Sequence, residues 1–93
     1  LFVPQGLSPD ADTKNDFWVI KGLPTGVDNT VTVYNRWGNK VYQKKNYDNT
    51  WGGLPNVSGT KKKEKLPQGT YYYIIEFSSS EFKPLNGFVI LQY

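Results

Sequence analysis

Short runs of alternating hydrophobic and polar residues, separated by turn-forming residues, make up most of this chain. Between residues 30 and 36, Val31 and Val33 alternate with polar or amphipathic side chains, which is the period-two pattern of a half-buried strand. Trp37-Gly38-Asn39 follows and predicts a tight turn, because Gly and Asn tolerate positive φ. Residues 40–44 then return as a partner strand that carries Val41 and Tyr42. This part of the chain is predicted to be a β-hairpin.

Residues 70–77 carry the strongest strand pattern in the chain. If they form a strand, Tyr71, Tyr73, Ile75 and Phe77 lie on one face, and Tyr72 and Ile74 lie on the other. A strand that is apolar on both faces is typical of the middle of a sheet. We therefore expect a central strand that is covered, at least in part, on each side.

The remaining segments are shorter or less regular. Pro4 cannot donate to a strand ladder, so residues 1–4 are predicted to be an edge segment. Further short strands are predicted at residues 17–20 and 87–93, and loops at residues 6–16, 46–53 and 54–68. Six or seven short strands spaced by roughly 8–12 residues indicate a sandwich or barrel. The predicted fold is an all-β, immunoglobulin-like antiparallel β-sandwich of about seven short strands.

The composition argues against an enzyme. The chain has no Cys and no His, which removes thiolate chemistry, histidine general bases and His-ligated zinc. It has three Trp, seven Tyr and five Phe, and each aromatic side chain can bury about 150–250 Å² in a small core. It also has no Met, so residues 1–93 are expected to be a single domain, either processed or excised from a longer protein.

The net charge of +3 comes largely from lysines in one Gly- and Ser-containing stretch, namely Lys61, Lys62, Lys63 and Lys65. Such a run is more typical of a solvated loop than of a phosphate site. Single-stranded nucleic-acid binding needs basic residues interleaved with stacking aromatics. Because these lysines lie apart from the aromatic strands, no nucleic-acid partner is expected.

The acidic loop near the start of the chain is a candidate calcium site. Calcium prefers six to eight oxygen ligands, and closely spaced carboxylates and amides can supply them. The candidate ligands are Asp10, Asp12, Asn15 and Asp16. The alternative is a loop in which Asn15 or Asp16 binds the local backbone. No other cofactor is predicted.

Arg36 and Trp37, at the tip of the predicted hairpin, are candidates for a docking surface, because Arg, Trp and Tyr dominate interface hot spots. Alternatively Trp37 packs into the core, the interpretation favoured for that residue alone, while Arg36 stacks on Tyr34 or pairs with a carboxylate. Arg36 is also the single arginine of the chain, which hints at a need for a planar, forked cation.

A second functional hypothesis is a carbohydrate-binding module. Exposed aromatic rings can stack on sugar rings, and the candidate residues are Trp18, Trp51, Tyr71, Tyr72 and Tyr73. Tyrosines on strands more often serve core or cross-strand packing. The discriminating feature is whether two or three of these rings are exposed together.

Five segments, in order along residues 4–93, resemble the gliding-motility-associated C-terminal domain, which is the type B sorting domain of the type IX secretion system. They are the Ser8-Pro9 loop with its Asn15-Asp16 end, Tyr34-Asn35-Arg36-Trp37-Gly38, residues 47–53 with Trp51, Leu66-Pro67-Gln68-Gly69-Thr70-Tyr71, and residues 87–93. Ser8, Pro9, Trp51, Gly69 and Tyr71 are taken as the structural residues of this motif set.

The resemblance implies a non-catalytic C-terminal signal domain that delivers upstream, covalently linked cargo. The implied partners are outer-membrane components of the type IX system, including one specific to type B domains. The implied location is the cell surface or medium of a Gram-negative bacterium, reached through the periplasm and outer membrane. We expect the recognised surface to include Arg36, Trp37, Gly38, Phe88 and Ile90. We also hypothesise that the last strand is a free sheet edge to which a partner strand can add.

Overall fold

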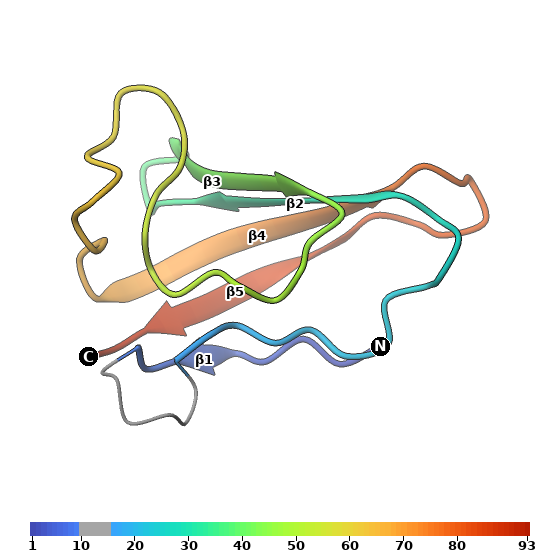
Figure 1. The fold of residues 1–93 in the computed structure, drawn as a ribbon, viewed down its shortest axis with the longest axis horizontal. Helices are drawn as coiled ribbons and strands as arrows, with labels where there is room; N and C mark the ends of the chain where they lie inside the picture. Colours follow the sequence, from blue (N-terminus) through green and yellow to red (C-terminus); the bar gives the residue numbers. More distant parts are fainter. Residues whose placement is uncertain (10–15) are drawn as a thin grey trace.

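The computed structural model describes residues 1–9 and 16–93, and these residues form an all-β structure without a helix. They build one five-stranded mixed sheet with the strand order β1-β5-β4-β2-β3 (Figure 1). All neighbouring strands are antiparallel except β1 and β5, which are parallel. The strands are β1 (Gly6–Leu7), β2 (Asn29–Tyr34), β3 (Lys40–Lys45), β4 (Gly69–Phe77) and β5 (Leu85–Leu91).

The all-β prediction is confirmed, although the described residues form five strands and not about seven. The predicted hairpin is present as β2 and β3, and the predicted central strand is β4, which pairs with β2 on one side and β5 on the other. Residues 6–7, predicted as loop, instead form β1.

The predicted strand at residues 17–20 is wrong, and its hydrogen bonds explain why. The N–H of Trp18 donates to the carbonyl of Trp51 (2.9 Å), and the N–H of Ile20 donates to the side-chain oxygen of Asn49 (2.9 Å). These partners lie in an irregular loop and not in a strand. The segment is extended and alternates in burial, but the nearest sheet pairing is a single bridge between Phe2 and Lys21.

Irregular segments replace the second sheet of a regular sandwich. Figure 1 shows the chain after β3 crossing in front of the sheet, and the segment before residue 21 running beside β1. Trp18 and Trp51 lie within these segments and are 0% and 1% exposed. The core therefore lies between one face of the sheet and these loops. Its hydrophobic side chains are Leu7, Trp18, Ile20, Val31, Val33, Val41, Tyr42, Tyr47, Trp51, Tyr71, Ile75, Val89 and Leu91.

Tyr47 ties the two covering segments together inside the core. Its hydroxyl donates to the carbonyl of Trp18 (2.6 Å) and accepts from the N–H of Trp51 (3.1 Å). Buried backbone groups outside regular structure need such partners, because leaving one without a hydrogen bond costs about 1–3 kcal/mol. One phenol thus satisfies two loop groups at once, which lets irregular chain serve as a core layer.

The opposite face of the sheet, which we call the outer face, carries no such covering. Tyr72 on β4 is 50% exposed, and Phe88 and Ile90 on β5 are 40% and 42% exposed. The expectation that β4 is covered at least in part on each side therefore holds for Ile74, which is partly buried, but not for Tyr72. The two tryptophans of the covering segments are buried on the other face.

The last strand is not a free edge at its end, which contradicts the edge-pairing hypothesis. The N–H of Ile90 donates to the carbonyl of Gln5 (2.8 Å), and the N–H of Gln92 donates to the carbonyl of Leu7 (3.0 Å). The short strand β1 thereby covers the end of β5. The edges of the sheet are β1 and β3.

The β3 edge is covered by one asparagine. The side chain of Asn56 accepts from the N–H of Gln43 (2.9 Å) and donates to the carbonyl of the same residue (2.8 Å). The N–H of Asn56 also donates to the carbonyl of Val41 (3.1 Å). The amide group therefore occupies backbone positions at which another strand could otherwise pair.

Replacing Asn56 with alanine is expected to uncover this edge. Loss of the two side-chain hydrogen bonds should lower the free energy of unfolding by about 1–2 kcal/mol, and the freed groups of Gln43 should promote self-association. Urea denaturation and light scattering after gel filtration would measure both effects. Ser58→Ala, in the same loop, is the control. A monomeric Asn56→Ala variant of unchanged stability would contradict the prediction.

Candidate functional site

Asn35 shapes the tip of the β2–β3 hairpin. Its side-chain oxygen accepts hydrogen bonds from the N–H groups of Trp37 and Asn39, both at 3.0 Å, and its carbonyl accepts from the N–H of Gly38 (3.0 Å). Gly38 has a φ of 81°, a value that L side chains rarely adopt. The sequence analysis did not assign this role to Asn35, although an asparagine just before a turn commonly bonds the backbone two residues on.

This turn places Arg36 and Trp37 in solvent and against each other. Trp37 is 71% exposed, so the interpretation that it packs in the core is wrong. The guanidinium carbon of Arg36 lies 4.2 Å from the centroid of the Trp37 ring, which is a cation–π contact. Arg36 therefore stacks on Trp37 and not, as one alternative had it, on Tyr34.

Arg36 makes no ion pair with a carboxylate of the described residues. Within residues 1–9 and 16–93, the ion pair present is between Lys45 and Asp28, at 3.9 Å between two exposed groups. The guanidinium of Arg36 is thus exposed and packs against an aromatic ring. Such a group suits recognition of a carboxylate or phosphate.

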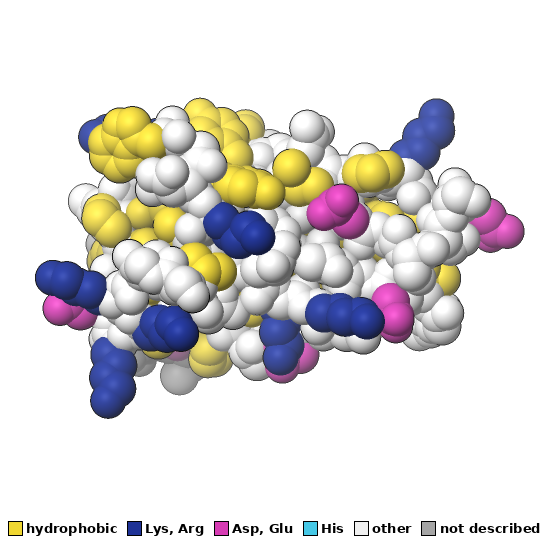
Figure 2. Space-filling model, turned by 90° about the horizontal axis from the view of Figure 1, so that it is seen from above, with side chains coloured by type: hydrophobic (Ala, Val, Ile, Leu, Met, Phe, Trp, Pro, Cys, Tyr) yellow, Lys and Arg dark blue, Asp and Glu magenta, His cyan; other side chains and the backbone are white. Residues whose placement is uncertain are grey.

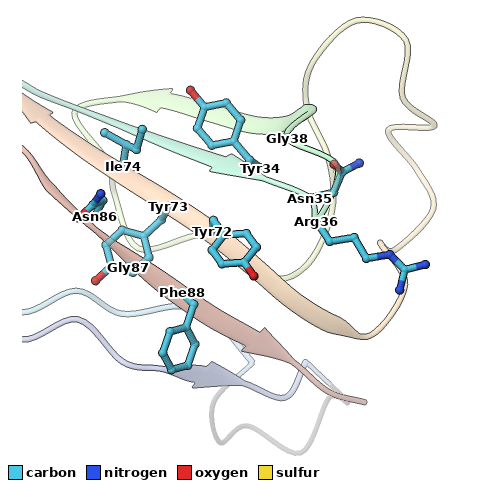
Figure 3. Close-up of a pocket in the computed structure, with 10 residues that line it drawn as sticks. All are labelled: Tyr34, Asn35, Arg36, Gly38, Tyr72, Tyr73, Ile74, Asn86, Gly87 and Phe88. Atoms are coloured by element: carbon cyan, nitrogen blue, oxygen red, sulfur yellow. The ribbon is translucent and has the colours of Figure 1, made fainter.

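Two shallow depressions meet at Arg36. The first, of about 510 Å³, lies on the outer face, and Figure 3 shows side chains from β2, β4 and β5 around it. The second, of about 370 Å³, lies between the hairpin tip and the start of β4. The first is lined by Tyr34, Asn35, Arg36, Gly38, Tyr72, Tyr73, Ile74, Asn86, Gly87 and Phe88. The second is lined by Asn35, Arg36, Trp37, Val41, Leu66, Pro67, Gln68, Gly69, Thr70 and Tyr71.

The structure brings most of the predicted partner-binding residues together. Arg36, Gly38 and Phe88 line the first depression, whereas Trp37 lines only the second. Ile90 lines neither, but it is exposed further along β5 on the same outer face as Phe88. Whether a partner binds these residues remains a prediction.

The residues taken as structural have separate roles. Gly69 and Tyr71 line the second depression, and the hydroxyl of Tyr71 donates to the carbonyl of Pro67 (2.6 Å). Burial raises the pKa of the Tyr71 phenol, and the nearby charge of Arg36 opposes that rise. Trp51 lies in the core. Pro9 is buried with its carbonyl accepting from Lys65, and Ser8 beside it is partly buried.

The sequence analysis missed an aromatic row that crosses the outer face. Tyr34 on β2 is directly opposite Tyr72 on β4, and Tyr72 is directly opposite Phe88 on β5. Direct cross-strand neighbours have Cβ atoms roughly 4.5–5.5 Å apart, so these three side chains are neighbours on the same face. The period-two pattern puts Tyr72 on this face, but only the register of the sheet brings the three rings into line.

The sugar-stacking platform suggested by the sequence does not form. Trp18, Trp51 and Tyr71 are 0%, 1% and 4% exposed, so three of the five candidate rings belong to the core. Tyr73 is partly buried and lies 5.2 Å from Trp18, measured between ring centroids. Of the residues proposed for this platform, Tyr72 alone presents half of its surface to solvent.

The calcium prediction stays a prediction. Asp10, Asp12 and Asn15 lie outside the described residues, and Asp16 is partly buried at their border. Within residues 1–9 and 16–93, no three acidic, His or Cys side chains lie close enough to hold a metal ion. In the same part of the chain there is no helix that could cross a membrane.

An exposed apolar surface beside a cationic turn is typical of an interaction surface. Comparison with known families identifies the family of this domain. Residues 1–91 match the CHU_C family, described as a type IX secretion signal domain, and the chain belongs to this family. The resemblance to type IX sorting domains inferred from the sequence is thus confirmed. Comparisons with curated proteins and with solved structures gave no significant match.

Proposed function

We propose that this domain is the non-catalytic signal by which the type IX machinery exports a covalently attached cargo across the outer membrane. The observation that carries the proposal is the family match, which extends over residues 1–91 and so includes every strand of the sheet. The cargo is then delivered to the cell surface or the medium after passage through the periplasm.

The partners in this proposal are outer-membrane components of the secretion system, including one that serves type B domains. The exposed residues at the hairpin tip and on β5 support this role, because Arg36, Trp37, Phe88 and Ile90 are available to a partner without unfolding. A folded domain presents such a surface already ordered. Binding then avoids most of the entropy cost of ordering a flexible peptide.

An export assay tests the proposal. Residues 1–93 would be fused behind a fluorescent protein that carries its own inner-membrane export signal, in a Gram-negative bacterium with a type IX system. Fluorescence at the surface and in the medium should require both the fused domain and an intact secretion apparatus. The reporter without the domain is the control. Retention of the fusion in the periplasm of cells with a working apparatus would contradict the proposal.

A further inference from the structure

The strand register divides the outer face into rows that change in character along the strands. At one end, Glu76, Thr30 and Lys45 form a charged row across β4, β2 and β3. The next row contains Asn86, Ile74 and Thr32. The third is the aromatic row of Tyr34, Tyr72 and Phe88, with Lys40 of β3 opposite Tyr34. Ile90 lies beyond this row, opposite Thr70. The polar end thus gives way to an apolar end.

The apolar end is exposed although the sheet pattern would place polar side chains there. In an antiparallel sheet with one solvated face, outward positions are typically polar. Here Tyr72, Phe88 and Ile90 occupy outward positions on two adjacent strands and are 50%, 40% and 42% exposed. Figure 2, which views the molecule from above, shows hydrophobic side chains gathered along one long border. Contiguous exposed apolar surface of this kind marks an interaction site.

The charged side chains at this end of the described face are two cations, Arg36 on the turn and Lys40 opposite Tyr34, and neither forms an ion pair with a carboxylate of residues 1–9 and 16–93. Figure 3 shows the Arg36 side chain extending from the turn that follows β2, at the same end as the rings of Tyr34, Tyr72 and Phe88. The acid of this face, Glu76, is four residues from Tyr72 along β4, or about 13 Å at roughly 3.3 Å per residue. That separation exceeds the Debye length of about 8 Å at physiological salt. A carboxylate for Arg36 is therefore missing from the described part of this face.

We propose that the aromatic row and Arg36 form one docking site for a protein segment that carries a carboxylate beside apolar side chains. The apolar side chains of that segment pack on Tyr72 and Phe88, and the guanidinium of Arg36, held by Trp37, receives the carboxylate. This inference rests on the proposed function, since the segment belongs to a component of the secretion machinery. Charge complementarity selects this occupant: the site offers an unpaired cation next to apolar rings.

The test is the export assay with single variants. Tyr72→Ser, Phe88→Ser and Arg36→Glu should each reduce export by about tenfold, because central aromatic and arginine residues dominate interface affinity. Arg36→Lys should restore only part of the export, since lysine lacks the planar fork. Two control variants should be exported normally. Phe17→Ser changes a 54% exposed ring outside the outer face, and Lys62→Glu makes the same charge change in a loop.

The outcomes separate this inference from the proposed function. If the unmodified fusion is not exported, the proposed function fails and this inference fails with it. If it is exported and the three variants are exported equally well, only the docking site is wrong. Circular dichroism checks the fold of each variant. Arg36→Glu lies on an exposed turn, so its result stands even if a serine variant unfolds.

Two further measurements on the purified domain test whether a second copy of the domain or a sugar binds the outer face instead. Sedimentation at rising concentration detects a second copy, and fluorescence titration with soluble polysaccharide detects a sugar. The proposal expects a monomer that binds no polysaccharide. A dimer, or polysaccharide binding, that is lost in Tyr72→Ser would assign the face to that occupant and overturn the proposal.

Discussion

Replacing Trp51 with alanine is expected to lower the free energy of unfolding by about 3–5 kcal/mol. Trp51 is 1% exposed and its ring packs against Trp18 and Tyr42, with centroid distances of 5.8 and 5.7 Å. Its indole N–H also donates to the carbonyl of Leu54 (3.0 Å). Alanine leaves a cavity where these side chains meet, in a domain whose total stability is on the order of 5–14 kcal/mol.

Urea denaturation followed by circular dichroism would measure this loss. The free energy of unfolding of a small domain falls by about 1–1.5 kcal/mol per molar urea, so the urea concentration at the unfolding midpoint should fall by about 2 M or more. Trp37→Ala is the matched control, because the same change at a 71% exposed side chain should cost less than about 1 kcal/mol. Equal losses in both variants would contradict the assignment of Trp51 to the core.

Raising the pH above about 10 is expected to destabilise the domain steeply, because buried tyrosines, above all Tyr42 and Tyr47, resist ionisation. Tyr42 and Tyr47 are each 6% exposed. Burial, reinforced by the charge of Asp48, raises the pKa of Tyr42 to about 12. Burial raises the pKa of Tyr47 further above its usual range, against the opposing effect of a hydrogen bond from Trp51.

The sign follows from comparing the folded and unfolded states. Below pH 10 both phenols are protonated in both states, so their full contribution to stability is present. Between pH 10 and about 12, the unfolded chain releases protons that the folded chain retains, and stability falls by up to about 1.4 kcal/mol per pH unit for each tyrosine.

Thermal melting between pH 8 and 12 would measure this dependence. Tyr42→Phe removes one of the two groups and should make the decline with pH shallower. Tyr72→Phe, at a half-exposed ring, should leave it unchanged. A melting temperature that stays constant up to pH 12 would contradict the prediction.

The sequence predicts the hairpin and the central strand because their signals are local. Alternation at residues 30–36 and the turn at Gly38 suffice for β2 and β3, and the dense pattern at residues 70–77 suffices for β4. The second layer has no such signal. Its backbone bonds go to distant loop groups, as from Ile20 to Asn49, and periodicity carries no information about them.

Trp37 and Trp51 show the same limit at the level of single residues. Each tryptophan is followed by a glycine, yet Trp37 is 71% exposed and Trp51 is 1% exposed. The difference arises from which loop crosses the core face, which is a tertiary property. The aromatic row is hidden from sequence reasoning in the same way, because Tyr34, Tyr72 and Phe88 meet through pairing between strands far apart in the chain.

The parallel pairing of β1 with β5 joins two strands that lie near opposite ends of residues 1–93. Gly6 pairs with Ile90, and Leu7 pairs with Leu91, so a chain still being made, or cut short before residue 90, has no seat for its first strand. Contacts between segments so far apart in sequence carry a large loop-closure entropy and slow folding. The five-stranded sheet is therefore complete only when residues 6–7 and residues 90–91 are both present.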